Sequence, residues 1–506
     1  MTIPLVNSIA SWFLKKRFHQ IELFLKYPNE VQNELLFQLL STAKDTEIGR
    51  KHEFSTITNY KTFSERVPIS SYEEYQNVIE RSRQGEHNIF WPNPIKWFAK
   101  SSGTTNAKSK FIPVSTESLE ECHYAASKDL LCMYLNNNED SQLFTGKGLR
   151  LGGSKELYKE NGTAYGDLSA ILIDNMPFWA EFSSTPSSKV SLMNDWEHKM
   201  KAIVDETINE NVTSLAGVPS WMLVLLNNVL DATGKDSLFD IWPNLEVYFH
   251  GGVSFVPYVD QYKAILPKSN FRYYESYNAS EGFFAIQDRN SSSELLLMLD
   301  YGIFYEFIPM DTYGTLEQRV IPLSAVVIGK NYAVIITTNA GLWRYKIGDT
   351  IRFTSISPYR IKVSGRTKHH INAFGEELII ENAEDALRKV CNSTQSEIVD
   401  YTAAPIFMKG RDKGSHEWLI EFKTPPSDIK VFNNLLDTAL KSLNSDYEAK
   451  RLNNMTLNMP TVHIAREHLF YDWLKHHDKL GGQHKIPRLS NSREYIDELL
   501  QLNTIS

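Results

Sequence analysis

A short polar loop carries the residues best suited to bind phosphate. Residues 100–110 read KSSGTTNAKSK, a run that contains Ser101, Ser102, Gly103, Thr104, Thr105, Lys108 and Lys110. Glycine lets the backbone turn with its N–H groups exposed, hydroxyls donate hydrogen bonds, and lysines supply positive charge against a polyphosphate. The chemistry that this combination favours is the binding of nucleotide phosphates.

The surroundings of this loop predict a strand, the loop and a second strand. Apolar runs flank the loop at 95–99 and 111–114. A Walker phosphate loop differs, because it has Gly before its Lys and a helix directly after it, whereas Ala107 precedes Lys108 here. Taken alone, the segment is equally well interpreted as a polar hairpin turn.

A second group of residues follows a predicted buried strand, 271–276. The next six residues, YNASEG, would form a loop at the carboxyl end of that strand, where open α/β sheets bind ligands. Glu281 offers a hard oxygen ligand for Mg²⁺ held against phosphates, and Tyr277 offers a flat face for an adenine ring. Gly251 and Gly252 follow an earlier predicted strand and would let adenine lie close to the backbone. The alternatives are an ordinary half-buried tyrosine and a solvated loop acid.

Three charged residues complete the set. Asp349 ends the segment LWRYKIGD, and a carboxylate can accept hydrogen bonds from both ribose hydroxyls. Arg366 lies in GRTK, where a guanidinium could donate a pair of hydrogen bonds to phosphate or ribose. Lys485 lies in a glycine-opened loop, GGQHKIPR. The simpler interpretations are a Gly-Asp turn between two strands, a surface arginine at a linker and a solvated tail loop.

These segments, in this order, resemble the signatures of the Gretchen Hagen family of acyl-acid amido synthetases, a branch of the adenylate-forming superfamily. SSGTT with Lys108 and Lys110 resembles the first signature, YNASEG the second, LWRYKIGD the third, and GRTK the hinge between domains. Ala107 is a departure, because many relatives have Gly there. The resemblance extends over nearly the whole chain and implies ATP and Mg²⁺ as cofactors.

The resemblance also assigns roles to residues. It implies that nucleotide is bound by Ser101, Ser102, Gly103, Thr104, Thr105, Lys108, Gly251, Gly252, Tyr277, Ser280 and Asp349. Glu281 would ligate the metal. Arg366 and Lys485 would be catalytic, with Lys485 brought to the phosphates when the C-terminal domain closes and excludes water.

The implied function is a ligase that adenylates a small carboxylic acid, releases pyrophosphate and passes the acyl group to the amine of an amino acid. The adenylation half rests on the recurrence in one chain of a phosphate loop, an adenine face, a metal carboxylate and a ribose carboxylate. The amide-forming half rests on the resemblance alone. The alternatives are a carboxylate–coenzyme A ligase with the same first step and a nucleotide-binding regulator without catalysis.

Hydrophobic periodicity predicts the elements that position these residues. Helices are expected at 21–25, 31–43 and 72–83, forming a cap on an α/β region with strands at 171–173, 245–249, 271–274 and 333–338 and a helix at 221–229. After Gly365 the pattern predicts a helix at 381–390, strands at 397–407 and 417–422, a helix at 428–443 and a strand at 461–464. We therefore expect an α/β protein with a large N-terminal adenylate-forming domain, 1–364, and a smaller mobile C-terminal α+β domain, 365–506.

Composition bounds the partners. A chain of 506 residues is long for one core, and its 53 basic and 61 acidic residues give a net charge of −8 without a basic run, which argues against nucleic acid. No segment has the pattern of a signal peptide or a membrane span, and three scattered cysteines indicate a reducing compartment. No nucleophile elbow or zinc-ligand spacing is present. We expect a cytoplasmic monomer whose partners are its acid and amino acid substrates.

Overall fold

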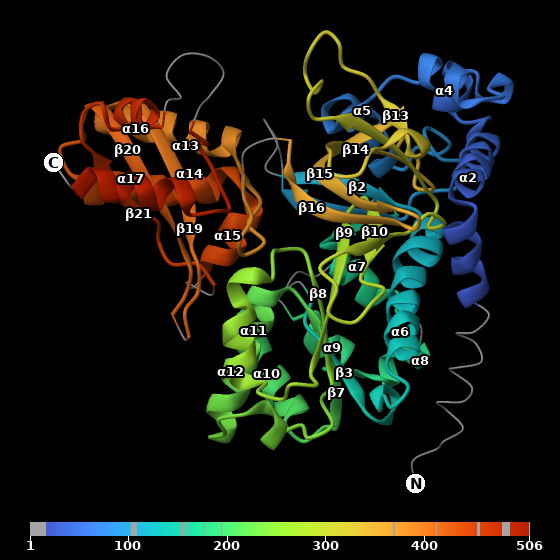
Figure 1. Ribbon diagram of the computed structural model, residues 1–506, viewed down its shortest axis with the longest axis horizontal. Coiled ribbons are helices and arrows are strands. Elements are labelled where there is room, and N and C mark those ends of the chain that lie inside the picture. Colours follow the sequence, from blue (N-terminus) through green and yellow to red (C-terminus); the bar gives the residue numbers. More distant parts are fainter. Residues whose placement is uncertain are drawn as a thin grey trace.

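The computed structural model describes residues 17–102, 109–152, 157–160, 162–176, 178–193, 195–367, 370–410, 412–452, 456–477 and 486–504. Figure 1 shows a larger body, coloured blue to light orange, and a smaller orange-to-red body beside it. Most of the proposed site residues that the structure describes come from strands of the larger body, so their positions depend on how its sheets are built.

The N-terminal part is helical, as predicted. Residues 17–26 form a helix that is followed by α2 (Pro28–Ala43), α3 (Glu47–Lys51), α4 (Tyr60–Arg66) and α5 (Tyr72–Arg83). The N-terminus of α5 is closed by a capping box between Ser71 and Glu74. Gln32 on α2 donates its amide to the carbonyl oxygens of Leu299 and Ile303, at 2.8 and 2.9 Å. The helices thus cap the strands that follow, and the predicted cap is confirmed.

One long mixed sheet runs through the larger body. Among the described residues its strand order is β13-β12-β14-β15-β16-β11-β10-β9-β8-β7-β3-β6. Its strands are β3 (Lys147–Arg150), β6 (Ser184–Thr185), β7 (Val212–Gly217), β8 (Val247–Gly251), β9 (Arg272–Ala279), β10 (Gly282–Ile286), β11 (Leu295–Leu297), β12 (Ile303–Pro309), β13 (Ile321–Pro322), β14 (Asn331–Thr338), β15 (Tyr345–Ile356) and β16 (Tyr359–Arg366). From β6 to β9 neighbouring strands are parallel, and from β9 to β13 they are antiparallel.

A second, smaller sheet carries the predicted phosphate loop. Its order is β2-β1-β5-β4, with β1 (Trp97–Ser102), β2 (Ser109–Val114), β4 (Tyr158–Glu160) and β5 (Thr163–Gly166). β1 and β2 are antiparallel, and Ser101 lies opposite Lys110. The two predicted strands are therefore confirmed, and the predicted loop between them, 103–108, lies outside the described residues.

Helices cover both faces of the parallel strands. They are the π-helical η2 (Ser118–Tyr124), α6 (Ala125–Asn137), α7 (Leu168–Asp174), α8 (Phe178–Phe182), α9 (Ser188–Ser191), α10 (Trp196–Thr207), α11 (Pro219–Thr233) and α12 (Val259–Ile265). Short 3-10 turns lie at Phe54–Thr56, Leu143–Thr145, Leu238–Asp240, Val256–Tyr258 and Leu323–Ala325. Leu215 and Tyr248 pack into a core cluster with α11, whereas Phe249 and Tyr274 pack into another with α6.

One predicted strand is wrong. Residues 171–173 lie in α7, where the backbone N–H groups of Ala170 and Ile171 donate to the carbonyl of Asp167. A short apolar run has the same composition in a buried helix and in a buried strand, so periodicity does not separate the two. The other strands and helices named above for the larger body lie within the observed elements or overlap them.

The smaller body has the predicted α+β order. Its elements are β17 (His370–Ile371), β18 (Leu378–Ile379), α13 (Ile380–Thr394), β19 (Glu397–Ile406), β20 (Ser415–Thr424), α14 (Ile429–Leu443), α15 (Ser445–Arg451), β21 (Thr461–Ala465), α16 (Leu469–His476) and α17 (Glu494–Thr504). Strands β19, β20 and β21 form one sheet, with α13 and α14 packed in one core cluster and α16 and α17 in another. The predicted domain boundary at 364–365 falls inside β16, two residues before its end at Arg366.

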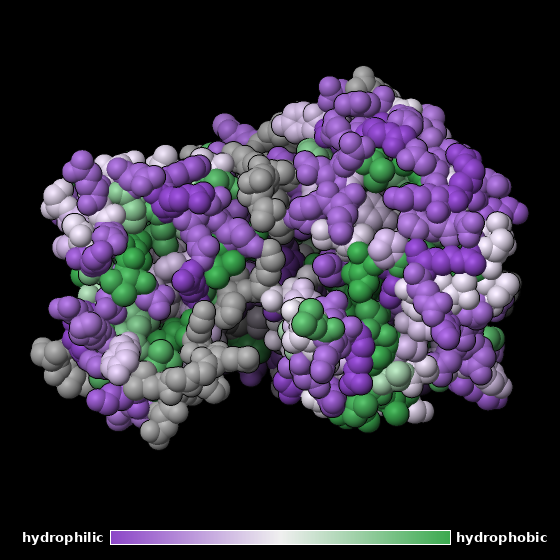
Figure 2. All heavy atoms as spheres, turned by 90° about the horizontal axis from the view of Figure 1, so that it is seen from above, coloured by the Kyte–Doolittle hydropathy of each residue, from purple (hydrophilic) through white to green (hydrophobic). Residues whose placement is uncertain are grey.

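The face of the larger body seen in Figure 2 is mostly hydrophilic. Purple side chains cover most of the larger body's face seen in Figure 2, with green patches between them. Among the described residues, no helix combines the length and the apolar character that crossing a membrane requires.

Candidate active site at the carboxyl edge of the parallel strands

The predicted adenine cradle lies at the carboxyl end of β8. Gly251 pairs with Ser276 of the parallel neighbour β9, and a Cβ atom at Gly251 would lie 2.5 Å from the Ser276 carbonyl oxygen. Gly252 follows with φ of 84°, a backbone conformation that favours glycine. The close approach of β9 therefore explains the glycine at 251, and β8 ends at the edge where open α/β sheets bind ligands, so the role of these glycines toward adenine stays a prediction.

Tyr277 lies in a strand, which corrects the prediction of a loop. Strand β9 continues to Ala279, and the β9–β10 hairpin turns at Ser280 and Glu281. The Tyr277 side chain is 9% exposed, its ring packs 4.9 Å from that of Phe284, and its hydroxyl donates to Asp349 Oδ2 at 2.7 Å. Tyr277 therefore orients Asp349, and its role as a face for adenine stays a prediction.

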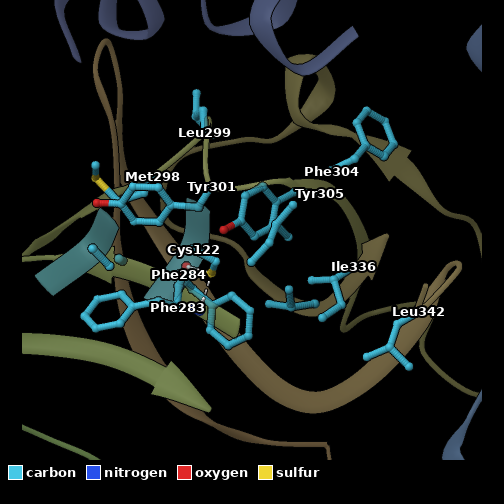
Figure 3. Close-up of a cluster of buried hydrophobic side chains, with 14 of the residues drawn as sticks. Cys122, Phe283, Phe284, Met298, Leu299, Tyr301, Phe304, Tyr305, Ile336 and Leu342 are labelled. Carbon is cyan, nitrogen blue, oxygen red and sulfur yellow. Dashed lines mark hydrogen bonds between the residues drawn. The ribbon is translucent and has the colours of Figure 1, made fainter. Parts of the chain in front are cut away.

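Buried aromatic side chains pack against the β9–β10 hairpin. Figure 3 shows Phe283 and Phe284 of β10 in one cluster with Cys122, Tyr301 and Tyr305. The backbone N–H of Phe283 donates to Cys122 Sγ at 3.2 Å. Because the cluster is buried, the hairpin that carries Tyr277, Ser280 and Glu281 has a fixed base.

Asp349 and Arg366 face each other across two strands. They are directly opposite in the antiparallel pair β15–β16, and Arg366 Nε donates to Asp349 Oδ1 at 2.8 Å. The alternative of a Gly-Asp turn between two strands is wrong, because β15 runs on through Asp349. Gly348 and Gly365 have φ of 87° and 143° beside the pair. The segments IGD and SGR, distant in sequence, thus build one ion pair.

Arg366 also reaches the smaller body. Its Nη2 donates to Glu377 Oε1 at 3.2 Å, and Glu377 precedes β18. Burial alone would lower the pKa of Arg366, but the carboxylates of Glu377 and Asp349 hold the pKa well above its ordinary value. Arg366 is therefore a cation that links the two bodies, and the interpretation as a free surface arginine at a linker is wrong.

Glu281 and Lys110 form the other charged part of the site. Burial raises the pKa of Glu281 from 4.5 to about 7, although the charge of Lys110 on β2 opposes the shift. Burial lowers the pKa of Lys110, and the carboxylates of Glu281 and Glu73 counteract this. Glu281 is therefore partly buried in the turn between β9 and β10, and its role as a metal ligand stays a prediction.

The site holds few candidate metal ligands. Within the residues that the structure describes, no group of three or more His, Cys, Asp and Glu side chains is placed to hold a metal ion. A metal at Glu281 would depend on that carboxylate and on oxygen atoms of a bound phosphate, which is the usual way in which proteins hold Mg²⁺.

The phosphate loop and the C-terminal lysine lie mostly outside the described residues. Ser101 and the backbone of Ser102 end β1, but Gly103, Thr104, Thr105 and Lys108 are not described, and neither is Lys485. Ile486, directly after Lys485, is buried with Ala404 and Leu419, on the sheet face of α16 and α17. The roles of these five residues stay predictions.

The loop between β17 and β18 lies against the adenine cradle. The Asn372 side-chain amide donates to the Gly252 carbonyl at 3.4 Å. Nearby, the Tyr258 hydroxyl donates to the Ala373 carbonyl at 2.7 Å, and Trp221 Nε1 donates to the Phe374 carbonyl at 3.2 Å. These contacts bring Glu377 to the site.

Sequence reasoning missed Glu377. It follows another acid, Glu376, in a segment without a recognised motif. Glu377 has φ of 40°, unusual for a residue with a side chain, and only the backbone reveals this. The sequence offers only its position, between the hinge segment 365–368 and the predicted helix 381–390, as an indication that Glu377 could lie near the site.

Comparison with known proteins places the chain in a family. Family models described as the GH3 family N-terminal domain, central domain and C-terminal domain match residues 17–271, 296–366 and 381–494. The chain therefore belongs to the GH3 family, and the resemblance inferred from its motifs is confirmed.

Similar curated proteins extend over nearly the same length. Indole-3-acetic acid-amido synthetase GH3.3 of Arabidopsis thaliana is 22% identical, over 99% of this chain and 96% of the relative. Jasmonoyl–L-amino acid synthetase JAR4 of Nicotiana attenuata is 22% identical, over 93% of this chain and 92% of the relative.

Solved structures confirm the fold. The AtGH3.15 acyl acid amido synthetase in complex with 2,4-DB superposes with a TM-score of 0.62 at 19% identity, over 98% of this chain and 96% of that one. A 2-hydroxyisobutyryl-CoA ligase in complex with 2-HIB-AMP and CoA gives a TM-score of 0.56 at 13% identity, over 94% of this chain and 92% of that one. The predicted α/β architecture, with a large N-terminal and a smaller C-terminal domain, is therefore correct.

Proposed function

We propose that this chain is an ATP-dependent ligase that adenylates a small carboxylic acid and transfers the acyl group to the amine of an amino acid, forming an amide. The observation that carries the proposal is the Asp349–Arg366 ion pair, with the Tyr277 hydroxyl bonded to the same carboxylate, in a chain of the GH3 family. The names of the relatives describe amido synthetases of different acids. We extend the type of reaction to this chain, but we do not assign it either of the acids that these names contain.

Two bonds are exchanged in this reaction. A carboxylate oxygen attacks the α-phosphorus of ATP, and the bond from that phosphorus to pyrophosphate breaks. The amine nitrogen then attacks the carbonyl carbon, the bond from that carbon to AMP breaks, and the nitrogen gives up a proton. Adenylation is needed because a carboxylate is a poor electrophile until one of its oxygens becomes part of a good leaving group.

Asp349 would hold the ribose. Each of its carboxylate oxygens accepts one hydrogen bond, from Tyr277 and from Arg366, which leaves lone pairs for two ribose hydroxyls. Arg366 would donate to phosphate or ribose. The backbone of Gly251 and Gly252 would accommodate adenine, with Ser280 in the neighbouring turn.

The phosphates would be bound by the loop that joins β1 and β2. Its proposed donors are Ser101, Ser102, Gly103, Thr104, Thr105 and Lys108. Glu281 would hold Mg²⁺, which supplies positive charge against the phosphates when bound. Burial disfavours the charged form of Glu281, so a nearby cation would restore the ionised carboxylate. Lys485, on a closing C-terminal domain, would stabilise charge that develops on the phosphates.

Acid-dependent exchange of radiolabelled pyrophosphate into ATP tests the first step, with a panel of carboxylic acids. We expect at least one acid to support exchange, AMP to be the nucleotide product, and excess chelator to stop turnover. Release of ADP and phosphate, or full turnover with chelator, would contradict adenylation. ATP turnover that no acid stimulates would favour the regulator.

Mass spectrometry of the products tests the second step. The mixture would contain an active acid, ATP, a pool of amino acids and coenzyme A. We expect an amide of one or more amino acids. A thioester as the dominant product would assign the chain to the carboxylate–coenzyme A ligases instead.

Two substitutions separate nucleotide binding from chemistry. Because Asp349 would hold the ribose before and during the reaction, Asp349→Ala should mainly weaken ATP binding, whereas Lys485→Ala should mainly slow adenylation. Each should cost about 2–4 kcal/mol, or roughly 30- to 1000-fold. Nucleotide titration beside single-turnover adenylation provides the measurement. An unchanged adenylation rate in Lys485→Ala would remove that lysine from the mechanism.

The same proposal includes the domain division 1–364 and 365–506, a monomeric state and a cytoplasmic location. The three cysteines, Cys122, Cys132 and Cys391, are free thiols, which supports the proposed cytoplasmic location. Light scattering of the purified chain should give the mass of one copy. A mass of two copies would contradict the monomer.

A further inference from the structure

Arg150 has an unusual position at the end of β3. It pairs with Ala216 on β7, and Leu149, one residue earlier, packs into the core cluster that contains α11. Because side chains alternate along a strand, Arg150 lies on the opposite face, together with Ala216 and Phe249.

This face and this edge are those of the adenine cradle. Gly251 follows Phe249 by two residues on β8 and therefore lies on the same face of the sheet, where it pairs with Ser276. Two strand spacings separate β3 from β8, a distance of about 10 Å. A ligand that runs from adenine across the strand ends would bring its acyl end toward Arg150.

Arg150 has a poor partner for a partly buried cation. Its Nη1 donates to the sulfur of Met176 at 2.9 Å, and a thioether is a weak acceptor. No ion pair joins Arg150 to a carboxylate among the described residues, in contrast to Arg366 and Arg344. Burial lowers the pKa of Arg150, with the Tyr124 hydroxyl group opposing the shift. Charges away from water are normally paired, so this guanidinium has free capacity for an anion.

The surroundings of Arg150 suit an organic acid better than a polyphosphate. Tyr124 on η2 uses its hydroxyl to donate to the Leu172 carbonyl at 2.9 Å. Next to β3, a Cβ atom at Gly152 would lie 2.8 Å from Ile173 Cδ1 of α7, so apolar groups of α7 approach closely. Glu120 and Asp174 act on the same Tyr124 hydroxyl and add negative charge nearby, so one guanidinium here fits one carboxylate on an apolar body better than several phosphates.

Building on the proposed function, we propose that Arg150 binds a carboxylate of the acid substrate and so acts as a positioning and specificity residue. The carboxylate is either the one that is adenylated or a second one on a dicarboxylic acid. In both cases the guanidinium would donate two hydrogen bonds to the two carboxylate oxygens, with the thioether of Met176 displaced.

Pyrophosphate exchange without amino acid tests the proposal in the wild type, Arg150→Met and Arg150→Lys. Acids of equal chain length with one or two carboxyl groups form the panel. We expect Arg150→Met to raise the KM for the acid by roughly 10- to 100-fold at an unchanged KM for ATP, with Arg150→Lys between. If Arg150→Met raises the KM for every acid, Arg150 binds the carboxylate that is adenylated. If the KM rises only for acids with two carboxyl groups, Arg150 binds the second carboxylate.

The matched control is Lys147→Met. Lys147 lies at the other end of β3 and pairs with Glu210 at 2.6 Å. The Lys147→Met variant should leave the KM for the acid and the KM for ATP unchanged. A wild-type KM for the acid in Arg150→Met would overturn the proposal. Unchanged exchange with a raised KM for the amino acid would overturn it too, because the anion would then belong to the acceptor.

Two further measurements do not depend on turnover. In calorimetric titrations, the wild type should bind benzoate and hexanoate more tightly than it binds their neutral amides. The Arg150→Met variant should lose this preference for the acids. Absence of any preference in the wild type refutes the proposal.

Thermal unfolding of Arg150→Met should have a midpoint at or above that of the wild type, because an unpaired charge is removed. A lower midpoint with a uniformly reduced kcat would show a purely structural role. Failure of the wild type with every acid and amine refutes the proposed function alone.

Discussion

Two regions of the larger body combine a tyrosine hydroxyl, a carboxylate and an arginine, and one is sealed whereas the other is left open. In the sealed cluster Arg344 donates Nε and Nη2 to the two oxygens of Glu306, each at 2.9 Å, and the Tyr60 hydroxyl donates to the same carboxylate. Arg344 Nη1 is bonded to the carbonyls of Ser64 and Val67. The side chains of Arg344 and Glu306 are 4% and 1% exposed.

The open cluster, Tyr277, Asp349 and Arg366, has the same groups but keeps lone pairs that can accept further hydrogen bonds. Asp349 receives one bond from Tyr277 and one from Arg366, whose other arm reaches Glu377 in the smaller body. The side chains of Arg366 and Asp349 are 23% and 9% exposed. An ion pair whose donors and acceptors are all used has no capacity left for a ligand, whereas one with lone pairs left at an open edge can bind a ligand.

The largest effect is expected when the sealed pair is broken. Arg344→Met should lower the free energy of unfolding by about 3–5 kcal/mol, because Glu306 is left as an uncompensated buried charge. Urea denaturation followed by circular dichroism measures the change. A loss below about 1 kcal/mol would mean that the two clusters do not differ in this way.

The converse is expected for the open pair. Arg366→Met should reduce single-turnover adenylation by roughly 30- to 1000-fold, which corresponds to about 2–4 kcal/mol. Because Arg366 is partly exposed, the free energy of unfolding should fall by only about 1 kcal/mol. Equal losses of stability in Arg366→Met and Arg344→Met, with activity retained in the former, would contradict the distinction.

The same contrast defines what the sequence can predict. Arg344 and Asp349 lie five residues apart in one signature, and the motif does not indicate that the first is structural and the second is at the edge. Exposure depends on which strands and helices pack around each residue, and those partners are distant in the sequence. Residue types are therefore predictable from local pattern, but their state of pairing is not.

Local signals succeeded where a single strand or helix decides the outcome. The two strands within 95–114 and the elements of the smaller body follow from periodicity and turn residues. Tyr277 lies in β9 and not in the predicted loop, because two turn residues, Ser280 and Glu281, suffice for the hairpin. Glu377 reaches the site only through the docking of the two bodies, which no local pattern encodes.

Glu281 sharpens the comparison through pH. Its pKa of about 7 against an ordinary 4.5 means that the folded state binds a proton more tightly than the unfolded state. Folding stability from this group is therefore full below about pH 4.5 and is lost as the pH rises through about 7. Between pH 5 and pH 8 the wild type should lose about 2 kcal/mol of unfolding free energy relative to Glu281→Gln.

Urea denaturation of both proteins at several pH values, without nucleotide or metal, checks this difference. The comparison with the glutamine variant cancels the titration of all other groups that the substitution leaves unchanged. A difference that is constant with pH would mean that Glu281 keeps an ordinary pKa and that its carboxylate is solvated.

The smallest effect compares the two tyrosines. Tyr60→Phe and Tyr277→Phe each remove one hydroxyl that donates to a carboxylate, at 2.9 and 2.7 Å. Each should cost about 1 kcal/mol of unfolding free energy, since the lost hydrogen bonds are of one kind. Only Tyr277→Phe should also weaken nucleotide binding, by roughly 3- to 10-fold, because Asp349 loses a group that orients it toward the ribose. Chemical denaturation and nucleotide titration of the pair separate the two effects. Weaker nucleotide binding in Tyr60→Phe would show that the sealed cluster communicates with the site, and the distinction between the two regions would then fail.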